Sequence, residues 1–139
     1  MTEAGPGPVE PVNLLLVDDR EGNLLALQAV LAAPDYRLIT ARSGAEALKL
    51  VLKHEFAVIL LDVAMPGMDG FETAALIKSR PRSARIPIIF VTASIPDVEH
   101  IFKGYSVGAV DYLRKPVDLH VVRAKVAVFA ELYRQRRQI

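Results

Sequence analysis

The chain has 139 residues and a formal net charge of +1, and its composition is 52% hydrophobic and 24% charged. Such a chain is long enough for one globular domain and too apolar to stay disordered. Its balanced charge gives no electrostatic case for nucleic acid or an anionic membrane as a partner. The sequence has no cysteine for disulfides or thiolate metal sites. No apolar run approaches the roughly 18–20 residues that span a bilayer, so we expect a cytoplasmic protein.

Strand-like and helix-like patterns alternate five times along the chain. Residues 1–11 are rich in proline and glycine and predict a flexible leader. A single domain is expected over residues 12–130, and residues 131–139 would extend its last helix. The predicted strands are Val12–Val17, Tyr36–Ala41, Phe56–Leu61, Ile86–Val91 and Ala109–Leu113. The predicted helices are Glu21–Ala33, Ser43–Lys53, Asp69–Ser79, Ile95–Tyr105 and one from Asp118 onward. In the second helix, Ser43 and Glu46 match a capping box.

Three of the predicted strands are apolar nearly throughout: VNLLLV, FAVILL and IPIIFV. Continuous apolar runs of this length are typical of strands buried on both faces, as in a parallel sheet covered by helices. Five consecutive strand–helix units therefore predict an α/β fold, a doubly wound parallel sheet of five strands flanked by five helices. In such sheets ligands bind at the carboxyl ends of the strands, near the point where strand order reverses.

Three aspartates follow the predicted strands at that edge: Asp18 and Asp19 after the first, and Asp62 after the third. Taken singly, each is explained as a turn former or a helix cap. Together they repel one another, and a hard cation such as Mg²⁺ would remove that conflict. With Lys115 included, the formal side-chain charge is −2, which one Mg²⁺ would balance.

Lys115 and Thr92 end or follow the two remaining strands of this edge. Lys115 precedes Pro116, which restricts the lysine backbone to extended conformations and makes their peptide bond a candidate for the cis form. The lysine would then aim across the strand ends, where its ammonium group suits phosphate oxygens. The Thr92 hydroxyl could donate to a phosphoryl oxygen. The ordinary alternatives are a solvated surface lysine and a threonine chosen for its strand preference.

Four segments carry a family resemblance: LLLVDD, LLDVAMPGMDGFE, FVTA and GAVDYLRKP. In this order and spacing, the chain resembles the chemotaxis-type receiver domains of response regulators in two-component signalling. The resemblance implies a flavodoxin-like strand order of 2-1-3-4-5. It also implies that Asp62 is the phosphoacceptor, that Lys115 pairs with the phosphoryl oxygens and that Thr92 and Tyr112 move as a switch. For Mg²⁺ it implies ligation by Asp19, Asp62 and the Ala64 backbone carbonyl, with Asp18 acting mainly through water.

The implied function is a signalling switch rather than an enzyme that acts on outside substrates. A sensor histidine kinase or a phosphotransfer protein would supply the phosphoryl group. The response would be a change in the surface made by helix 4, strand 5 and helix 5, which is read by a downstream protein. A phosphatase would need an inserted cap region, which the sequence lacks, and a phosphate-free scaffold would be expected to lack some of the site residues.

Two residues of this chain bear on how long the acyl phosphate would last. Ala64, two residues after the acceptor, and Ser94, two after Thr92, stand where the family adjusts the lifetime of the acyl phosphate. Because the Ala64 side chain cannot hydrogen-bond the attacking water, we expect Ala64→Asn to change the rate of dephosphorylation several-fold.

The last predicted helix carries apolar residues at helical spacing: Leu119, Val122, Val126 and Phe129 should pack on the sheet. Further apolar residues lie partly off that stripe, at Val121, Val128 and Leu132. Ordinary core packing with a frayed end is one reading of this helix. A homodimer, a kinase contact and a connection to a following domain, as in hybrid histidine kinases, are the others.

Overall fold

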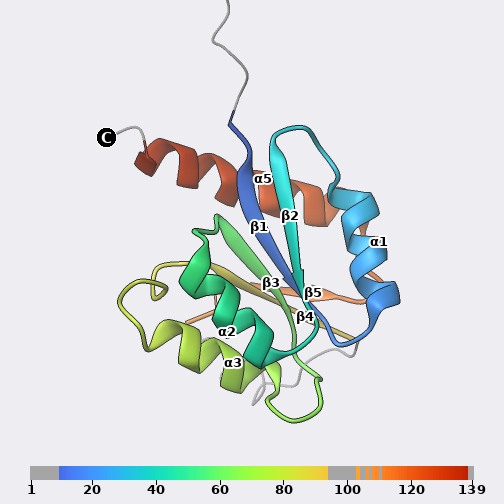
Figure 1. Cartoon of the computed structure of the whole chain (residues 1–139). Coiled ribbons are helices and arrows are strands. Elements are labelled where there is room, and N and C mark those ends of the chain that lie inside the picture. The colour runs from blue at the N-terminus through green and yellow to red at the C-terminus, as the bar shows by residue number, and fades with distance from the viewer. Residues whose placement is uncertain (1–9, 94–102, 104–105, 107, 110, 138–139) are drawn as a thin grey trace, which may run out of the picture.

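The structure is a computed structural model that describes residues 10–93, 103, 106, 108–109 and 111–137. Five parallel strands form one sheet in the order β2-β1-β3-β4-β5, as predicted, so strand order reverses between β1 and β3 (Figure 1). The strands are β1 (Val12–Val17), β2 (Tyr36–Ala41), β3 (Val58–Asp62), β4 (Ile88–Thr92) and β5 (Asp111–Arg114). The helices are α1 (Glu21–Leu31), α2 (Gly44–Lys53), α3 (Gly70–Lys78) and α5 (Leu119–Arg137).

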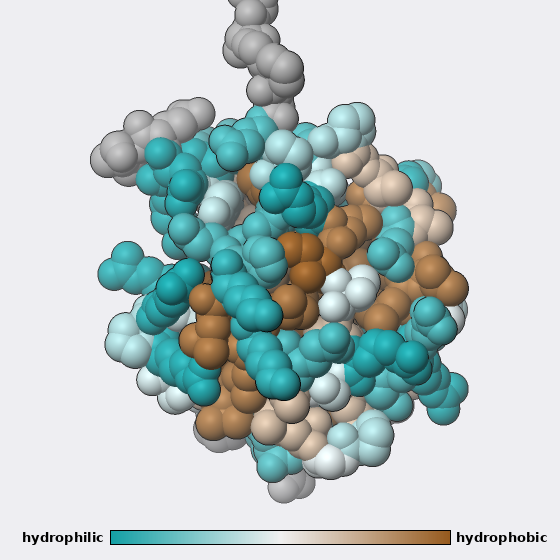
Figure 2. All heavy atoms as spheres, in the orientation of Figure 1, coloured by the Kyte–Doolittle hydropathy of each residue, from teal (hydrophilic) through white to brown (hydrophobic). Residues whose placement is uncertain are grey.

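Four of the five predicted helices are thus present in the part of the chain that is described. The helix predicted at Ile95–Tyr105 lies almost entirely outside that part, as does most of the leader predicted over residues 1–11. None of the described helices is both long and apolar enough to cross a membrane. Hydrophobic and hydrophilic side chains are interspersed over the face that carries α1, α2 and α3 (Figure 2).

Two apolar clusters, one on each face of the sheet, explain why the central strands are apolar throughout. Successive residues of a strand point to opposite faces. Leu14 and Leu16 accordingly pack with α1 and α5, whereas Leu15 and Val17 pack with α2 and α3. All four side chains are at most 2% exposed. Because both faces are covered, neither set of alternating positions can be polar.

The helix ends follow local chemistry. Helix α1 ends at Leu31, before the predicted end at Ala33, because Pro34 disfavours helical backbone in the residue that precedes it. At the start of α2, the Ser43 hydroxyl accepts the Glu46 N–H at 3.1 Å, as the capping box requires. The Glu46 carboxylate, however, accepts from the N–H of Arg42 at 2.6 Å rather than from Ser43.

Helix α5 buries a stripe that differs from the predicted one. Val122, Val126 and Ala130 are completely buried, while Phe129 is only partly buried against the same cluster. The prediction that Leu119 packs on the sheet is wrong, since this residue is 40% exposed. Leu119 is the first residue of the helix, and a helical side chain leans toward the N-terminus, which carries it past the end of the packed surface.

Candidate functional site

The side chains that could take part in binding or reaction lie at the carboxyl edge of the sheet, where the strands end. Asp18 directly follows β1 and Lys115 directly follows β5. Asp62 and Thr92 are the last residues of β3 and β4, one residue beyond the predicted strand limits at Leu61 and Val91. Both strands also begin two residues later than predicted. Phe56 and Ile86 are apolar, but they belong to the loops that lead into β3 and β4.

Three carboxylates meet at this edge. Asp18, Asp19 and Asp62 each offer one carboxylate oxygen, and these oxygens all lie within 4.8 Å of one another. Asp18 is 2% exposed and Asp62 is 4% exposed, so neither charge is well solvated. An all-oxygen donor set of this kind suits a hard divalent cation such as Mg²⁺.

Lys115 crosses the ends of the strands to reach the carboxylates. Its Nζ lies 2.9 Å from Oδ2 of Asp18 and 3.3 Å from Oδ1 of Asp62. Its backbone N–H donates to the carbonyl of Thr92 at 2.7 Å, and the peptide bond to Pro116 is cis, as predicted. Burial lowers the pKa of Lys115, but the two carboxylates outweigh that effect and raise it. The lysine is therefore a permanent positive charge in the site.

Asp18 is held by two further donors that the sequence analysis did not single out. Its Oδ1 accepts the backbone N–H of Arg20 at 2.9 Å, and its Oδ2 accepts the side-chain amide of Asn23 at 3.1 Å. Asn23 lies in the first turn of α1, so the start of this helix orients the carboxylate. The spacing of five residues between Asp18 and Asn23 is a sequence signal for this role, because it places the amide on the helix turn that faces the Asp18 carboxylate.

Asp62 has the most perturbed carboxyl group of the site. Burial, followed by the charge of Asp18, raises its pKa from 3.8 to about 6, and Lys115 and the N–H of Ala64 oppose that rise only in part. The protein alone thus leaves negative charge at Asp62 incompletely compensated. A divalent cation bound between the three carboxylates would supply the missing compensation.

The loop after Asp62 requires glycine at position 70. A Cβ placed on Gly70 would lie 2.3 Å from the carbonyl oxygen of Asp62 and 2.8 Å from Cα of Val63, both backbone atoms. The Gly70 N–H also donates to the carbonyl of Val63 at 2.9 Å. The start of α3 is therefore packed directly on the backbone of the acidic residue.

We expect Gly70→Ala to lower the free energy of unfolding by about 1–3 kcal/mol, since the backbone has to shift to admit the methyl group. Gly22→Ala is the matched control, because nothing lies within 4 Å of a Cβ at Gly22 in α1. That substitution should raise the free energy of unfolding by about 0.4–1 kcal/mol. Urea titration of both variants measures the difference, and equal effects would contradict the packing argument.

Thr92 and Tyr112 lie on the neighbouring strands β4 and β5. Thr92 pairs in register with Arg114, and Tyr112 pairs with Phe90, two residues earlier on each strand. Both residues are partly exposed, and the Tyr112 ring lies 5.5 Å from that of Phe90, centroid to centroid. The structure thus brings the two predicted switch residues to adjacent strands, with Tyr112 against the core.

Comparison with known proteins agrees with this arrangement. "Response regulator PleD" of Caulobacter vibrioides is 40% identical over 113 residues, which cover 81% of this chain and 25% of that protein. The "Probable cyclic di-GMP phosphodiesterase" of Vibrio cholerae is 39% identical over 114 residues, with 81% and 25% covered. The chain spans about a quarter of the length of these two curated relatives.

The fold and the family model lead to the same group of proteins. The structure of chemotaxis protein CheY4 of Vibrio cholerae matches with a TM-score of 0.80 at 29% identity, covering 86% of this chain and 98% of that one. The family model described as "Response regulator receiver domain" matches residues 14–127, a range that contains the three clustered aspartates and Lys115. This chain belongs to the family of response regulator receiver domains, the phosphoacceptor switches of two-component signalling.

Proposed function

We propose that Asp62 is the residue that accepts the phosphoryl group, with Lys115 as the cation that pairs with the phosphoryl oxygens. The observation that carries this proposal is the contact of the Lys115 ammonium with Asp62, inside a group of three carboxylates. A carboxylate in that position can act as a nucleophile toward phosphorus. A lysine that already lies at 3.3 Å from its oxygen is placed to neutralise the incoming charge.

The donor would be the phosphohistidine of a histidine kinase or phosphotransfer protein, in the cytoplasm. One carboxylate oxygen of Asp62 forms a bond to phosphorus while the bond from phosphorus to the imidazole nitrogen breaks. The electron pair of that bond stays on the imidazole, which takes up a proton. Since phosphoryl transfer requires mainly alignment and charge compensation, Lys115 and the hydroxyl of Thr92 would act by holding the phosphoryl oxygens.

The three carboxylates would also hold the metal. We assign Asp19 and Asp62 as direct ligands of Mg²⁺, together with the backbone carbonyl of Ala64, and Asp18 as a ligand through water. When bound, Mg²⁺ would screen the negative charge that the acceptor and the phosphoryl group bring together. Asp18 is suited to an indirect role because three donors already occupy its two oxygens.

The response would pass through Thr92 and Tyr112 to a protein partner. Thr92 would turn toward the phosphoryl group and Tyr112 would move inward behind it, which changes the surface formed by helix 4, β5 and α5. Of that surface, β5 and α5 lie within the described residues. Three large apolar side chains of α5 are 42–56% exposed there, which supports contact with a partner protein or a second copy: Val121, Val128 and Leu132.

Intact-protein mass tests the proposal. After incubation with acetyl phosphate and Mg²⁺, the wild type should gain the mass of one phosphoryl group. The gain should be absent with EDTA in place of Mg²⁺ and absent in Asp62→Asn. A wild type that gains no mass, even from a phosphorylated kinase, would support a scaffold that never carries phosphate.

The lifetime of the acyl phosphate should depend on Ala64. This residue is exposed and its N–H bonds to the Asp62 carboxyl group, so it lies beside the proposed acceptor. We expect Ala64→Asn to change the rate of dephosphorylation several-fold, because an amide can hydrogen-bond the attacking water. The decay of the phosphorylated mass with time measures the rate. Lys49→Ala, an exposed change in the middle of α2, should leave it unaltered.

A further inference from the structure

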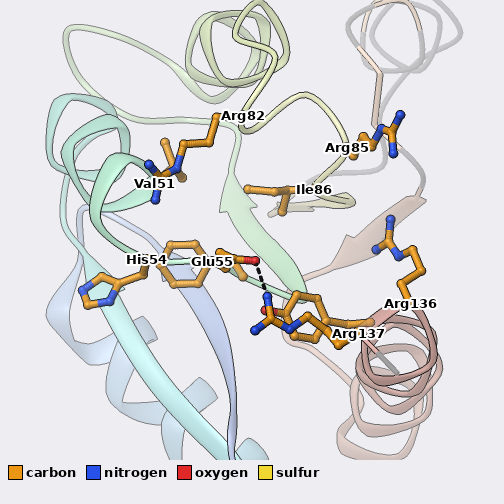
Figure 3. Close-up of a pocket in the computed structure, with 10 residues that line it drawn as sticks. Val51, His54, Glu55, Arg82, Arg85, Ile86, Arg136 and Arg137 are labelled. Atoms are coloured by element: carbon orange, nitrogen blue, oxygen red, sulfur yellow. Dashed lines mark hydrogen bonds and ion pairs between the residues drawn. The ribbon is translucent and has the colours of Figure 1, made fainter. Parts of the chain in front are cut away.

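A cavity with concentrated positive charge lies at the opposite edge of the sheet from the carboxylates. It has a volume of about 210 Å³ and is bordered by the end of α2, the segment that enters β3, the loop before β4 and the last turns of α5 (Figure 3). Its apolar lining comes from Val51, Phe56 and Ile86. Nothing in the phosphoacceptor chemistry uses these residues.

Four arginines and one carboxylate border this cavity: Arg82, Arg85, Arg136, Arg137 and Glu55. Glu55 pairs with Arg137 at 2.8 Å and also hydrogen-bonds to Tyr133. The other three arginine side chains have no ion pair or hydrogen bond with any residue that the structure describes. Three guanidinium groups around one cavity thus have no carboxylate partner in the part of the chain that the structure describes.

The four arginines are spread around the cavity and are not gathered at one point. Arg85 and Arg136 also line an adjoining hollow that lies toward Phe129. Arg82 and Arg137 also line a separate trough, which shares no lining residue with that hollow. The central cavity therefore has guanidinium groups on several sides: Arg85 and Arg136 lie on one side, Arg82 lies beside Val51, and Arg137 lies beside Glu55 (Figure 3).

The charge at this edge exceeds that of the whole protein. The cavity and its trough are lined by seven lysine or arginine side chains and two carboxylates, whereas the chain has a net charge of only +1. Clustered positive charges repel one another and attract anions. Guanidinium groups in particular bind phosphate and carboxylate oxygens in a bidentate manner.

We propose that this cavity is a binding site for a small molecule that carries a diphosphate or longer phosphate chain, as a nucleoside diphosphate does. One phosphoryl group lies between Arg85 and Arg136 and the linked group faces Arg137. Guanidinium groups on several sides of the cavity favour a ligand with two linked anionic groups over a single phosphate. The small volume and the apolar lining favour a small molecule over a macromolecule. Glu55 competes with the ligand for Arg137.

Calorimetric titration of the full chain with sodium pyrophosphate tests the site, in EDTA and at constant ionic strength. We expect binding that weakens at least tenfold when Arg85→Ala and Arg136→Ala are combined. Both side chains are exposed and have no partner among the described residues, so this variant should keep its fold, which circular dichroism verifies. Glu55→Gln should bind several-fold more tightly because it frees Arg137. Lys49→Ala and Asp62→Asn, which lie outside the cavity, should bind as the wild type does.

The proposal fails if orthophosphate binds as tightly as pyrophosphate, or if the double arginine variant keeps its affinity. It also fails if Asp62→Asn loses binding, because the ligand then lies at the carboxylate edge. Tighter binding of an RNA oligonucleotide or an acidic peptide than of pyrophosphate would overturn the small-molecule assignment. Comparison with ADP and adenosine identifies the source of the diphosphate. Tighter binding of ADP indicates a nucleotide and equal binding indicates the diphosphate group alone, and either result supports the site.

Discussion

Replacing Lys115 with alanine is expected to lower the free energy of unfolding at pH 7, in the absence of Mg²⁺, by about 2–4 kcal/mol. Asp18 and Asp62 are both at most 4% exposed, and Lys115 is the cation that contacts the two of them. Removing one partner of a buried ion pair leaves uncompensated charge, which costs about 3–5 kcal/mol in other proteins. The expected loss is smaller here because Asp62 can take up a proton.

Urea titrations of the wild type and Lys115→Ala, in EDTA and in millimolar Mg²⁺, measure this effect. The divalent cation should restore most of the lost stability, since it compensates the same carboxylates. Lys49→Ala serves as the control, because it removes an exposed lysine of α2 that has no ion-pair or hydrogen-bond partner among the described residues. Equal stability of Lys115→Ala and Lys49→Ala would show that Lys115 does not compensate the buried charge.

In the Mg²⁺-free protein, the contribution of Asp62 to the free energy of unfolding is expected to fall as pH rises from about 4 to about 6. The pKa of Asp62 is raised from 3.8 to about 6 by burial and by Asp18. Between these values the folded protein holds a proton that the unfolded chain has lost, so the free energy of unfolding decreases with pH. A difference of about two pKa units corresponds to about 3 kcal/mol, all of it lost by pH 7.

Asp62→Asn isolates this contribution, because an amide has no proton to lose in that range. The variant should be more stable than the wild type at pH 7 by about 1–3 kcal/mol in EDTA, with the gap closing toward pH 4. Millimolar Mg²⁺ should also narrow the gap, by stabilising the ionised wild type. Parallel curves of the free energy of unfolding for the two proteins between pH 4 and 7 would show that folding does not raise the pKa of Asp62.

The topology was predictable from the sequence because both faces of the central strands are covered. Leu14 and Leu15 face opposite helix layers, and only a sheet between two layers makes successive residues apolar. The limits of the strands were less predictable. Phe56 and Ile86 are as apolar as strand residues but belong to the preceding loops, because burial rather than pairing selects for hydrophobicity.

The site was predicted where it depends on strand ends and not where it depends on helix ends. Asp18, Asp62 and Lys115 come together because parallel strands place their carboxyl ends at one edge. The role of Asn23 depends on how the first turn of α1 faces Asp18, and the five-residue spacing that indicates it was not used in the sequence analysis. The full capping box of Asp69 and Glu72 was likewise missed, although its spacing is the same as that of Ser43 and Glu46.

The arginine cavity could not be predicted from the pattern of residues along the chain. Its lining comes from three segments far apart in the sequence, residues 51–56, 82–86 and 133–137. Each segment alone resembles a solvated helix end or a loop. Only the return of α5 toward the amino-terminal edge of the sheet places Arg136 and Arg137 beside the loop that carries Arg82 and Arg85.

The most direct test of the central claim is to locate the phosphoryl group on the chain. Borohydride reduces an aspartyl phosphate to homoserine, so trypsin digestion and mass spectrometry of the phosphorylated, reduced protein would identify the acceptor. Cleavage after Lys53 and Lys78 isolates Asp62 from Asp18 and Asp19, whose peptide ends at Arg20. We predict reduction at Asp62 alone, in the presence of Mg²⁺ and not in EDTA. Reduction at another aspartate, or at none in a protein that has gained phosphoryl mass, would contradict the assignment.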